Sequence, residues 1–155
     1  GMSRWVGLLG REFGEDQVQR AAEADGAGAA GGVGFGLRVV LGAVLESGFD
    51  IVATALDLDA RVAASDLVIT SEGSLDAQSM MGKGPGCLLE LGEKHRVPVM
   101  IVPGRIGDLA DQDQRRFAGI VSLESVCGLQ EATSRPSYAL RAATEQLLVP
   151  LVDGR

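Results

Sequence analysis

The chain has 155 residues, of which 46% are hydrophobic, and this is enough to fill the core of one globular domain. Its formal net charge of -7 argues against a general nucleic-acid surface, which needs a basic stripe to neutralise phosphates. Two cysteines are too few for a secreted disulfide framework, and no apolar run approaches the roughly 20 residues that span a bilayer. The composition therefore indicates a cytoplasmic protein with no membrane segment and no nucleic-acid partner.

The first third of the chain is expected to be helical and glycine-rich. Gly1 is interpreted as a scar of tag removal, and Met2 as the natural start. Apolar residues at helical spacing predict a helix, a turn and a second helix over residues 3–24. A glycine-rich turn then leads into a predicted helix over residues 37–45, whereas residues 49–56 fit a strand or a helix equally well.

From Asp66 onward, short apolar segments alternate with helical patterns. Three segments are predicted to be buried strands, namely residues 67–69, 97–102 and 120–123. Helices are predicted over residues 85–95, 109–117 and 137–148, the last with Ser134 or Ser137 as its N-cap. Apolar strands that alternate with helices predict an α/β fold, with a parallel or mostly parallel sheet covered on both faces. The predicted core includes Leu67, Val68, Ile69, Val99, Ile101 and Val121.

The connection from Thr70 to Gly86 is much longer than the 2 to 6 residues that usually join a strand to a helix. Ligands of parallel sheets bind beyond the carboxyl ends of the strands, where this loop and residues 103–108 are expected to lie. Within the loop, Glu72 and Asp76 could share a magnesium ion, or one of them could accept a proton from an attacking hydroxyl group. Alternatively, Glu72 caps a turn and Asp76 caps the helix that follows.

Lys83 is a single cation in the stiff segment Gly82–Gly86, where it could pair with a phosphoryl group as a point charge. The segment is not a Walker loop, because Gly84 follows the lysine where that motif requires Ser or Thr. The alternative is an ordinary surface lysine. His95 is the only histidine; at the predicted end of a helix it is given no catalytic role.

The segment from Gly26 to Gly31 matches the G-x-G-x-x-G dinucleotide pattern, but no strand precedes it, as that fingerprint requires. Consecutive glycines before a helix can instead expose backbone N–H groups to a phosphate or a carboxylate. The glycines could equally serve only to let the helix pack closely against a neighbour.

Three motifs follow one another along the chain, namely GAGAAGG from Gly26, ASDLVITSEGSLDAQ from Ala64, and GKGP from Gly82. In this order and spacing they closely resemble the bacterial glycerate kinase family. The resemblance runs from about Gly26 to the C-terminus. Family members phosphorylate D-glycerate with ATP and a divalent metal, usually to 2-phosphoglycerate, and they have two α/β lobes around a cleft. They are more than twice as long, so the chain is expected to be a single α/β region over residues 2–155 that corresponds to their C-terminal part, with a helical N-terminal edge over residues 2–25.

The resemblance implies roles for individual residues. Asp76, Lys83 and Glu72 are the expected catalytic residues, with Asp76 favoured as the base, and Glu72 and Asp76 are the expected ligands of Mg²⁺. The expected substrate or phosphate-binding residues are Gly26, Gly28, Gly31, Gly32, Ser71, Gly73 and Ser74. Ser71 stands where the family usually has glycine. Because much of the family's cleft is absent from these residues, we expect a homo-oligomer or a separate chain that completes the site. The alternative is a truncated, catalytically incomplete homologue that acts as a binding or structural module and could still bind an anion.

Overall fold

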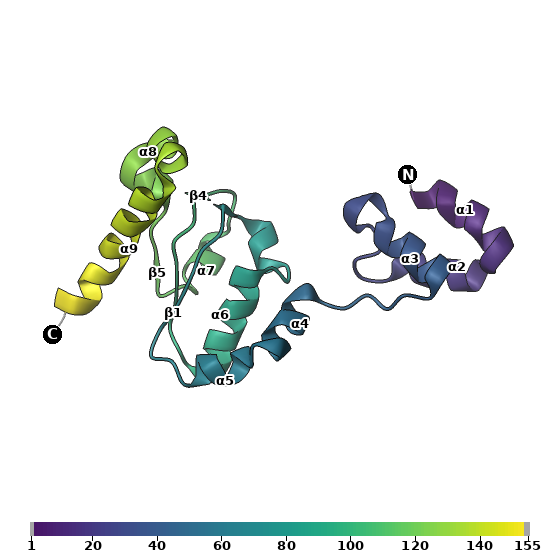
Figure 1. Ribbon diagram of the computed structural model, residues 1–155, viewed down its shortest axis with the longest axis horizontal. Coiled ribbons are helices and arrows are strands. Elements are labelled where there is room, and N and C mark those ends of the chain that lie inside the picture. The colour runs from purple at the N-terminus through teal and green to yellow at the C-terminus, as the bar shows by residue number, and fades with distance from the viewer. Residues whose placement is uncertain (1, 154–155) are drawn as a thin grey trace. The chain divides into compact units, whose positions relative to one another are not determined.

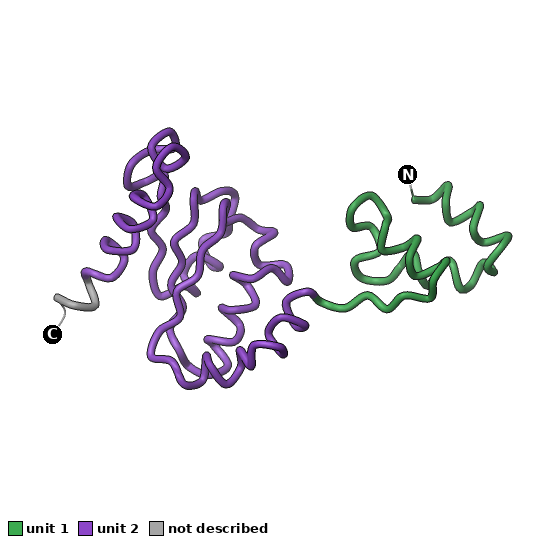
Figure 2. The backbone as a smooth tube through the Cα atoms, viewed as in Figure 1, with its two compact units in different colours: residues 1–47 green, residues 48–155 purple. Residues whose placement is uncertain are grey.

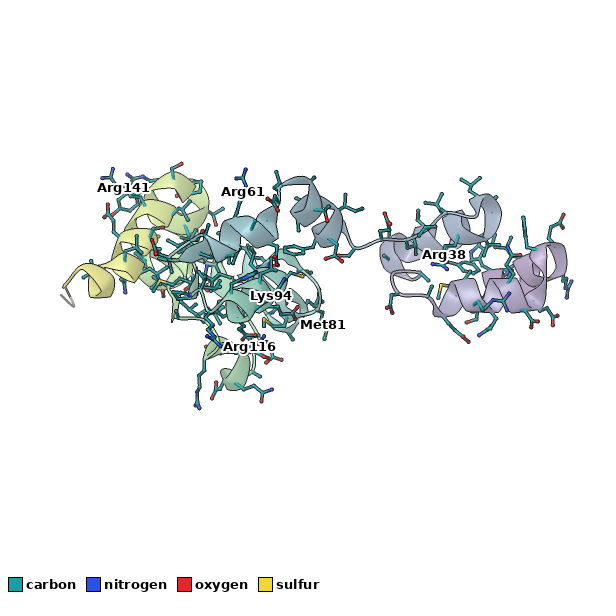
Figure 3. All side chains as sticks on the ribbon, turned by 90° about the horizontal axis from the view of Figure 1, so that it is seen from below. Arg38, Arg61, Met81, Lys94, Arg116 and Arg141 are labelled. Carbon is teal, nitrogen blue, oxygen red and sulfur yellow. The ribbon has the colours of Figure 1, made fainter. Side chains whose placement is uncertain are left out.

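The computed structural model describes residues 2–153 and divides into two compact units, residues 1–47 and residues 48–155 (Figure 2). The described part of the first unit is helical. All strands of the described chain belong to the second unit. The expected correspondence of residues 2–155 to a single α/β region stays a prediction.

Unit 1 is built around an apolar cluster that its helices bury together. The elements are α1 (Met2–Phe13), α2 (Glu15–Glu23), the short 3₁₀ helix η1 (Ala29–Gly31) and α3 (Val33–Leu41). Val18, Phe35 and Val39 are among the fully buried residues of the cluster. The predicted helix, turn and helix over residues 3–24 is confirmed. The helix predicted over residues 37–45 begins and ends earlier, because Gly42 takes the left-handed conformation (φ 65°) and terminates it.

The sheet of unit 2 is parallel, as predicted. Its strands β1 (Val68–Thr70), β3 (Val99–Ile101) and β5 (Gly119–Ile120) lie in the order β1-β3-β5. Val68 is the register partner of Val99, and Met100 is the partner of Gly119. All three strands therefore end at the same edge. Beyond it, β2 (Ser74–Leu75) and β4 (Arg105–Ile106) form a second parallel pair, which the sequence did not predict.

Helices cover both faces of the three-stranded sheet, which confirms the α/β fold class. Figure 1 shows the strands between α6 (Gly84–His95) and α9 (Pro136–Asp153). On the α6 face, Leu89 packs with Val99 and Ile101 in one buried cluster. On the α9 face, Ala143 and Leu147 pack with Met100 and Val102. The helix predicted over residues 85–95 is confirmed, whereas α9 begins at Pro136, so Ser137 lies within its first turn and is not its cap.

The remaining helices differ in part from the predictions. They are α4 (Gly48–Ala55), α5 (Leu58–Ala63), α7 (Asp111–Gln114) and α8 (Leu123–Ser134). The ambiguous segment 49–56 is thus helical. The helix predicted over 109–117 shrinks to α7, because the apolar residues at both ends of that range are buried in the core instead of forming a helical stripe. No helix among residues 2–153 is both long and apolar enough to cross a membrane.

The strand predicted over residues 120–123 was too long at its carboxyl end. The backbone leaves β5 after Ile120, and Ser122 becomes the N-cap of α8, a helix that was not predicted. The Ser122 hydroxyl accepts a hydrogen bond from the backbone N–H of Ser125 at 3.1 Å. A capping serine satisfies one of the free N–H groups of a helix start, which is why the chain changes direction here.

The predicted core is correct except at one position. Val99 and Ile101 are buried, and Leu67, Val68 and Val121 are partly buried against the two clusters. Ile69 is 42% exposed, so its assignment to the core was wrong. Ile69 is the register partner of Met100, so its side chain is on the α9 face of the sheet. However, it lies on the edge strand β1 and is not part of the buried cluster beneath α9.

Candidate active site

The acidic loop, residues 71–83, begins where β1 ends and runs beside the segment that follows β3. Backbone N–H groups of residues 104, 105 and 107 donate to the carbonyls of Glu72, Gly73 and Leu75, at 2.8, 3.2 and 2.8 Å. Further along, the N–H of Ala77 donates to the carbonyl of Asp108 at 2.9 Å. The first half of the loop is thus held to the neighbouring segment like a strand, at the sheet edge where ligands of parallel sheets bind.

Gly104 lets the two segments approach closely enough for these bonds. A Cβ atom on Gly104 would lie 2.5 Å from the carbonyl oxygen of Gly73, a distance that real side chains essentially never show. A Cβ on Gly107 would lie 3.3 Å from Ser74 Oγ and 3.2 Å from Asp76 Cβ. Both glycines were missed by sequence reasoning, since the requirement for glycine comes from residues some thirty positions earlier in the chain.

Glu72 carries an unsatisfied oxygen. Its Oε2 atom is buried and has no hydrogen-bond partner within the described part of the chain. A buried carboxylate oxygen without a partner is costly, so such an atom indicates a missing cation, proton or ligand. A magnesium ion fits this chemistry, because it binds one or two carboxylates and completes its shell with phosphate oxygens and water. No three His, Cys, Asp or Glu side chains of the described residues cluster as a ready metal site, so substrate and water would have to supply the other ligands.

Asp76 caps the short 3₁₀ helix η2 (Ala77–Met80), as the alternative reading of the sequence predicted. Its Oδ1 atom accepts from the backbone N–H of Gln78 at 2.9 Å. In return, the hydroxyl of the buried Ser79 accepts from the Asp76 N–H at 3.1 Å and donates to the Ser74 carbonyl at 3.3 Å. These reciprocal bonds orient the Asp76 carboxylate. Asp76 therefore has a structural role, as the cap of η2, that does not depend on a substrate.

Lys83 is exposed and occupies the N-cap position of α6. Its Nζ donates to Oε1 of Gln78 at 3.2 Å. Gln78 thus connects two of the three predicted catalytic residues, because its backbone N–H binds Asp76 while its side chain binds Lys83. Sequence reasoning gave Gln78 no role. The start of α6 lies close to η2. A Cβ atom on Gly86 would be only 2.6 Å from the Ser79 carbonyl oxygen, so this approach requires glycine.

One face of the β2/β4 pair gathers further polar side chains. Ser74 is the register partner of Arg105, and register partners in parallel strands point to the same face. A Cβ atom added to Gly107 would lie next to the side chains of Ser74 and Asp76, so Asp76 is on that face too. Arg105 is exposed and forms no ion pair in the described structure. The sequence offered one signal for it: a cation shortly after the end of a buried strand, four residues beyond Ile101.

The other predicted site residues fall in two places. Ser71 donates its hydroxyl to the Val102 carbonyl at 2.7 Å and so pins the loop to the end of β3, while Gly73 lies in the hydrogen-bonded part of the loop. The four glycines of the glycine loop belong to unit 1, so whether they act together with the acidic loop stays a prediction.

Within the glycine loop, most of the predicted binding residues have a conformational reason to be glycine. Gly26, Gly31 and Gly32 have positive φ angles of 78°, 71° and 97°. The Gly32 N–H already donates to the Ala29 carbonyl at 3.0 Å, and a Cβ on Gly34 would lie 2.8 Å from the Gly26 carbonyl oxygen. These contacts support the interpretation that the glycines let the chain turn and pack closely. They also leave fewer backbone N–H groups free to bind an anion.

Comparisons with known proteins agree on one family. The glycerate kinase family model matches residues 1–151. Glycerate 2-kinase of Escherichia coli (strain K12) is 44% identical over 114 residues, which cover 73% of this chain and 30% of the relative. Glycerate kinase of Bacillus subtilis (strain 168) is 43% identical over 84 residues, which cover 54% of the chain and 22% of the relative. The chain thus spans less than a third of the length of these curated relatives.

A solved structure is similar over nearly the whole chain. The crystal structure assigned to a glycerate kinase 2 of Salmonella typhimurium LT2 superposes with a TM-score of 0.62 at 29% sequence identity. The match covers 98% of this chain and 38% of that one. The α/β arrangement described above therefore recurs in part of a larger protein.

Proposed function

The chain belongs to the glycerate kinase family, and on this premise we propose that its acidic loop serves the transfer of a phosphoryl group from ATP to D-glycerate. The product would be phosphoglycerate, with the 2-phosphate as the expected isomer. The observation that carries the proposal is the buried, unpartnered Oε2 of Glu72 in a clamped loop beyond the carboxyl edge of a parallel sheet. We further propose a two-lobed cleft and a cytoplasmic location, which suits a reaction that consumes ATP.

The residues divide the chemistry among them. Glu72 and Asp76 would hold magnesium, which neutralises developing charge on the phosphate oxygens. Asp76, oriented by its bonds to η2, accepts the proton of the attacking glycerate hydroxyl as the new P–O bond forms and the bond to ADP breaks. Lys83 and Arg105 supply positive charge for the transferring group, with Gln78 positioning Lys83. The glycine loop of unit 1 is proposed to contribute backbone N–H groups to phosphate binding.

We propose that the site is completed by residues beyond those of this sequence, in a second copy or in another polypeptide segment. Unit 1 exposes large apolar side chains that such a partner would cover, including Trp5 (60% exposed), Leu41 (73%) and Val44 (79%). Phosphoryl transfer depends on positioning and on charge stabilisation from several sides. The 155 residues alone are therefore expected to show little kinase activity.

The second candidate is an anion-binding module without catalysis. One observation favours it: Asp76 and Lys83 are both already engaged in local hydrogen bonds that explain their positions without a substrate. In this case the loop would still bind phosphate, but no product would form.

A chimaeric enzyme separates the two candidates. This chain would replace the segment that it matches in the E. coli glycerate 2-kinase, and ADP formation would be measured with and without D-glycerate. The kinase proposal predicts glycerate-dependent turnover within about 10²-fold of the parent enzyme, since a small misplacement of the catalytic groups costs up to roughly this factor. A chimaera that is folded by circular dichroism, yet forms no ADP above background, would favour the binding module.

A further inference from the structure

A second polar site lies at the opposite edge of the sheet. A cavity of about 340 Å³ opens where β3 and β5 begin, whereas the acidic loop follows the carboxyl end of β1. Its apolar walls include Leu89, Phe117 and the segment Val97–Val99. Leu89 and Phe117 also belong to the hydrophobic core, so the floor of the cavity is part of the packed interior of unit 2.

The rim of this cavity is positively charged in a chain whose net charge is -7. Arg96, Arg115 and Arg116 line it together with a single acidic residue, Glu93. Arg116 is already occupied: its Nε and an Nη atom donate to the two carboxylate oxygens of Glu93 at 2.8 and 2.9 Å. This pair lowers the pKa of Glu93 and raises that of Arg116, so both stay charged. Arg96 and Arg115 form no ion pair within the described part of the chain.

Arg96 is held in a backbone conformation that its side chain does not favour. It ends α6 in the left-handed region, with φ 58° and ψ 34°, and its N–H bonds back to the carbonyls of Gly92 and Glu93. Glycine is the usual residue at this position of a helix end, because it has no Cβ to clash. An arginine kept there at a conformational cost, on the rim of a cavity that two further arginines line, indicates a role for its guanidinium group.

We propose that this cavity binds a small organic anion, with a phosphate or carboxylate group on Arg96 and Arg115 and an apolar body against Val97, Pro98 and Phe117. Guanidinium groups bind the paired oxygens of both anions, and the apolar wall favours a ligand with a hydrophobic part. Glu93 acts as an internal competitor, since it holds Arg116 and repels an incoming anion. The inference does not depend on the kinase proposal, because the residues and the sheet edge are different.

The test uses phenyl phosphate as probe, titrated into the ¹⁵N-labelled chain at low salt and followed by amide chemical shifts. Benzoate replaces the phosphate group by a carboxylate. Inorganic phosphate has the anionic group without the apolar body, and benzyl alcohol has the apolar body without the anionic group. We expect saturable shifts around residues 96–98 and 115–118 with phenyl phosphate or benzoate, and weaker binding of the two half-probes. Absence of saturable shifts at these residues with both full probes would overturn the proposal.

Three variants assign the binding to the side chains. Arg96→Gly is expected to weaken binding by about tenfold, the value of one charge-assisted contact, with a thermal midpoint no lower than wild type because glycine suits φ 58°. Glu93→Gln is expected to bind more tightly, because it removes the competing carboxylate and leaves Arg116 with only its longer ion pair to Asp113, at 3.7 Å. Arg141→Gln on α9, which breaks only an exposed pair with Glu145, should leave the affinity unchanged. Wild-type affinity in Arg96→Gly, or weaker binding by Glu93→Gln, contradicts the proposal.

Discussion

Asp76→Asn is expected to reduce the turnover of the chimaeric kinase by roughly 10²-fold or more, the usual scale for loss of a general base. The substitution is informative because asparagine keeps an acceptor oxygen and is itself a favoured N-cap, so the bond from the Gln78 N–H is retained. What disappears is the negative charge and the ability to take a proton. Lys83→Ala should cost a similar factor, because it removes a charge that stabilises the transferring phosphoryl group.

Initial rates at saturating D-glycerate and ATP measure this effect, with Asp111→Asn on α7 as the matched control of an exposed aspartate outside the loop. The control should retain wild-type turnover. If Asp76→Asn also did, then Asp76 would be only the cap of η2, and the base would have to be sought elsewhere.

Gly104→Ala is expected to destabilise the chain by about 1 to 3 kcal/mol, the range for an added methyl group in a packed site. The new Cβ would lie 2.5 Å from the Gly73 carbonyl oxygen, so the two segments must separate. Separation lengthens the bonds from Gly104 and Arg105 to the acidic loop. Urea unfolding followed by circular dichroism measures the loss.

Gly73→Ala provides the matched control, since a Cβ at Gly73 has no atom within 4 Å. Its cost should stay below about 1 kcal/mol, the difference usual for a glycine in an ordinary backbone conformation. Equal stabilities of the two variants would show that the loop is not clamped at Gly104. In the chimaera, Gly104→Ala should also lower turnover, because Glu72 is displaced together with Gly73.

The general architecture could be predicted from the sequence because its signals are local. The apolar runs around Val68, Val99 and Ile120 alternate with helical patterns, and this alternation alone specifies parallel strands with helices between them. The length of the Thr70–Gly86 connection singled out this loop, and the loop does lie at the carboxyl edge of the sheet, as predicted. Even the cap role of Asp76 was available as an alternative from its position before η2.

The details that failed depend on contacts between distant segments. The β2/β4 pair is held by backbone bonds between polar, glycine-containing stretches, which carry no hydrophobic period. Ile69 looks like a core residue by composition, and only the strand order reveals that it lies on an exposed edge. The clamp at Gly104 and the side-chain bridge from Gln78 to Lys83 likewise need three-dimensional neighbours.

The proposed phosphoryl transfer depends most on the buried Oε2 atom of Glu72. A calorimetric titration of Mg·ATP into the chimaera, compared with its Glu72→Gln variant, tests this oxygen directly. Glutamine keeps the shape but not the charge, so the affinity for Mg·ATP should fall by about tenfold or more, as expected for one lost charge-assisted contact. Glu90→Gln, an exposed change on α6, is the control and should bind like wild type. Equal affinities of the wild type and Glu72→Gln would contradict a metal or phosphate site in the acidic loop.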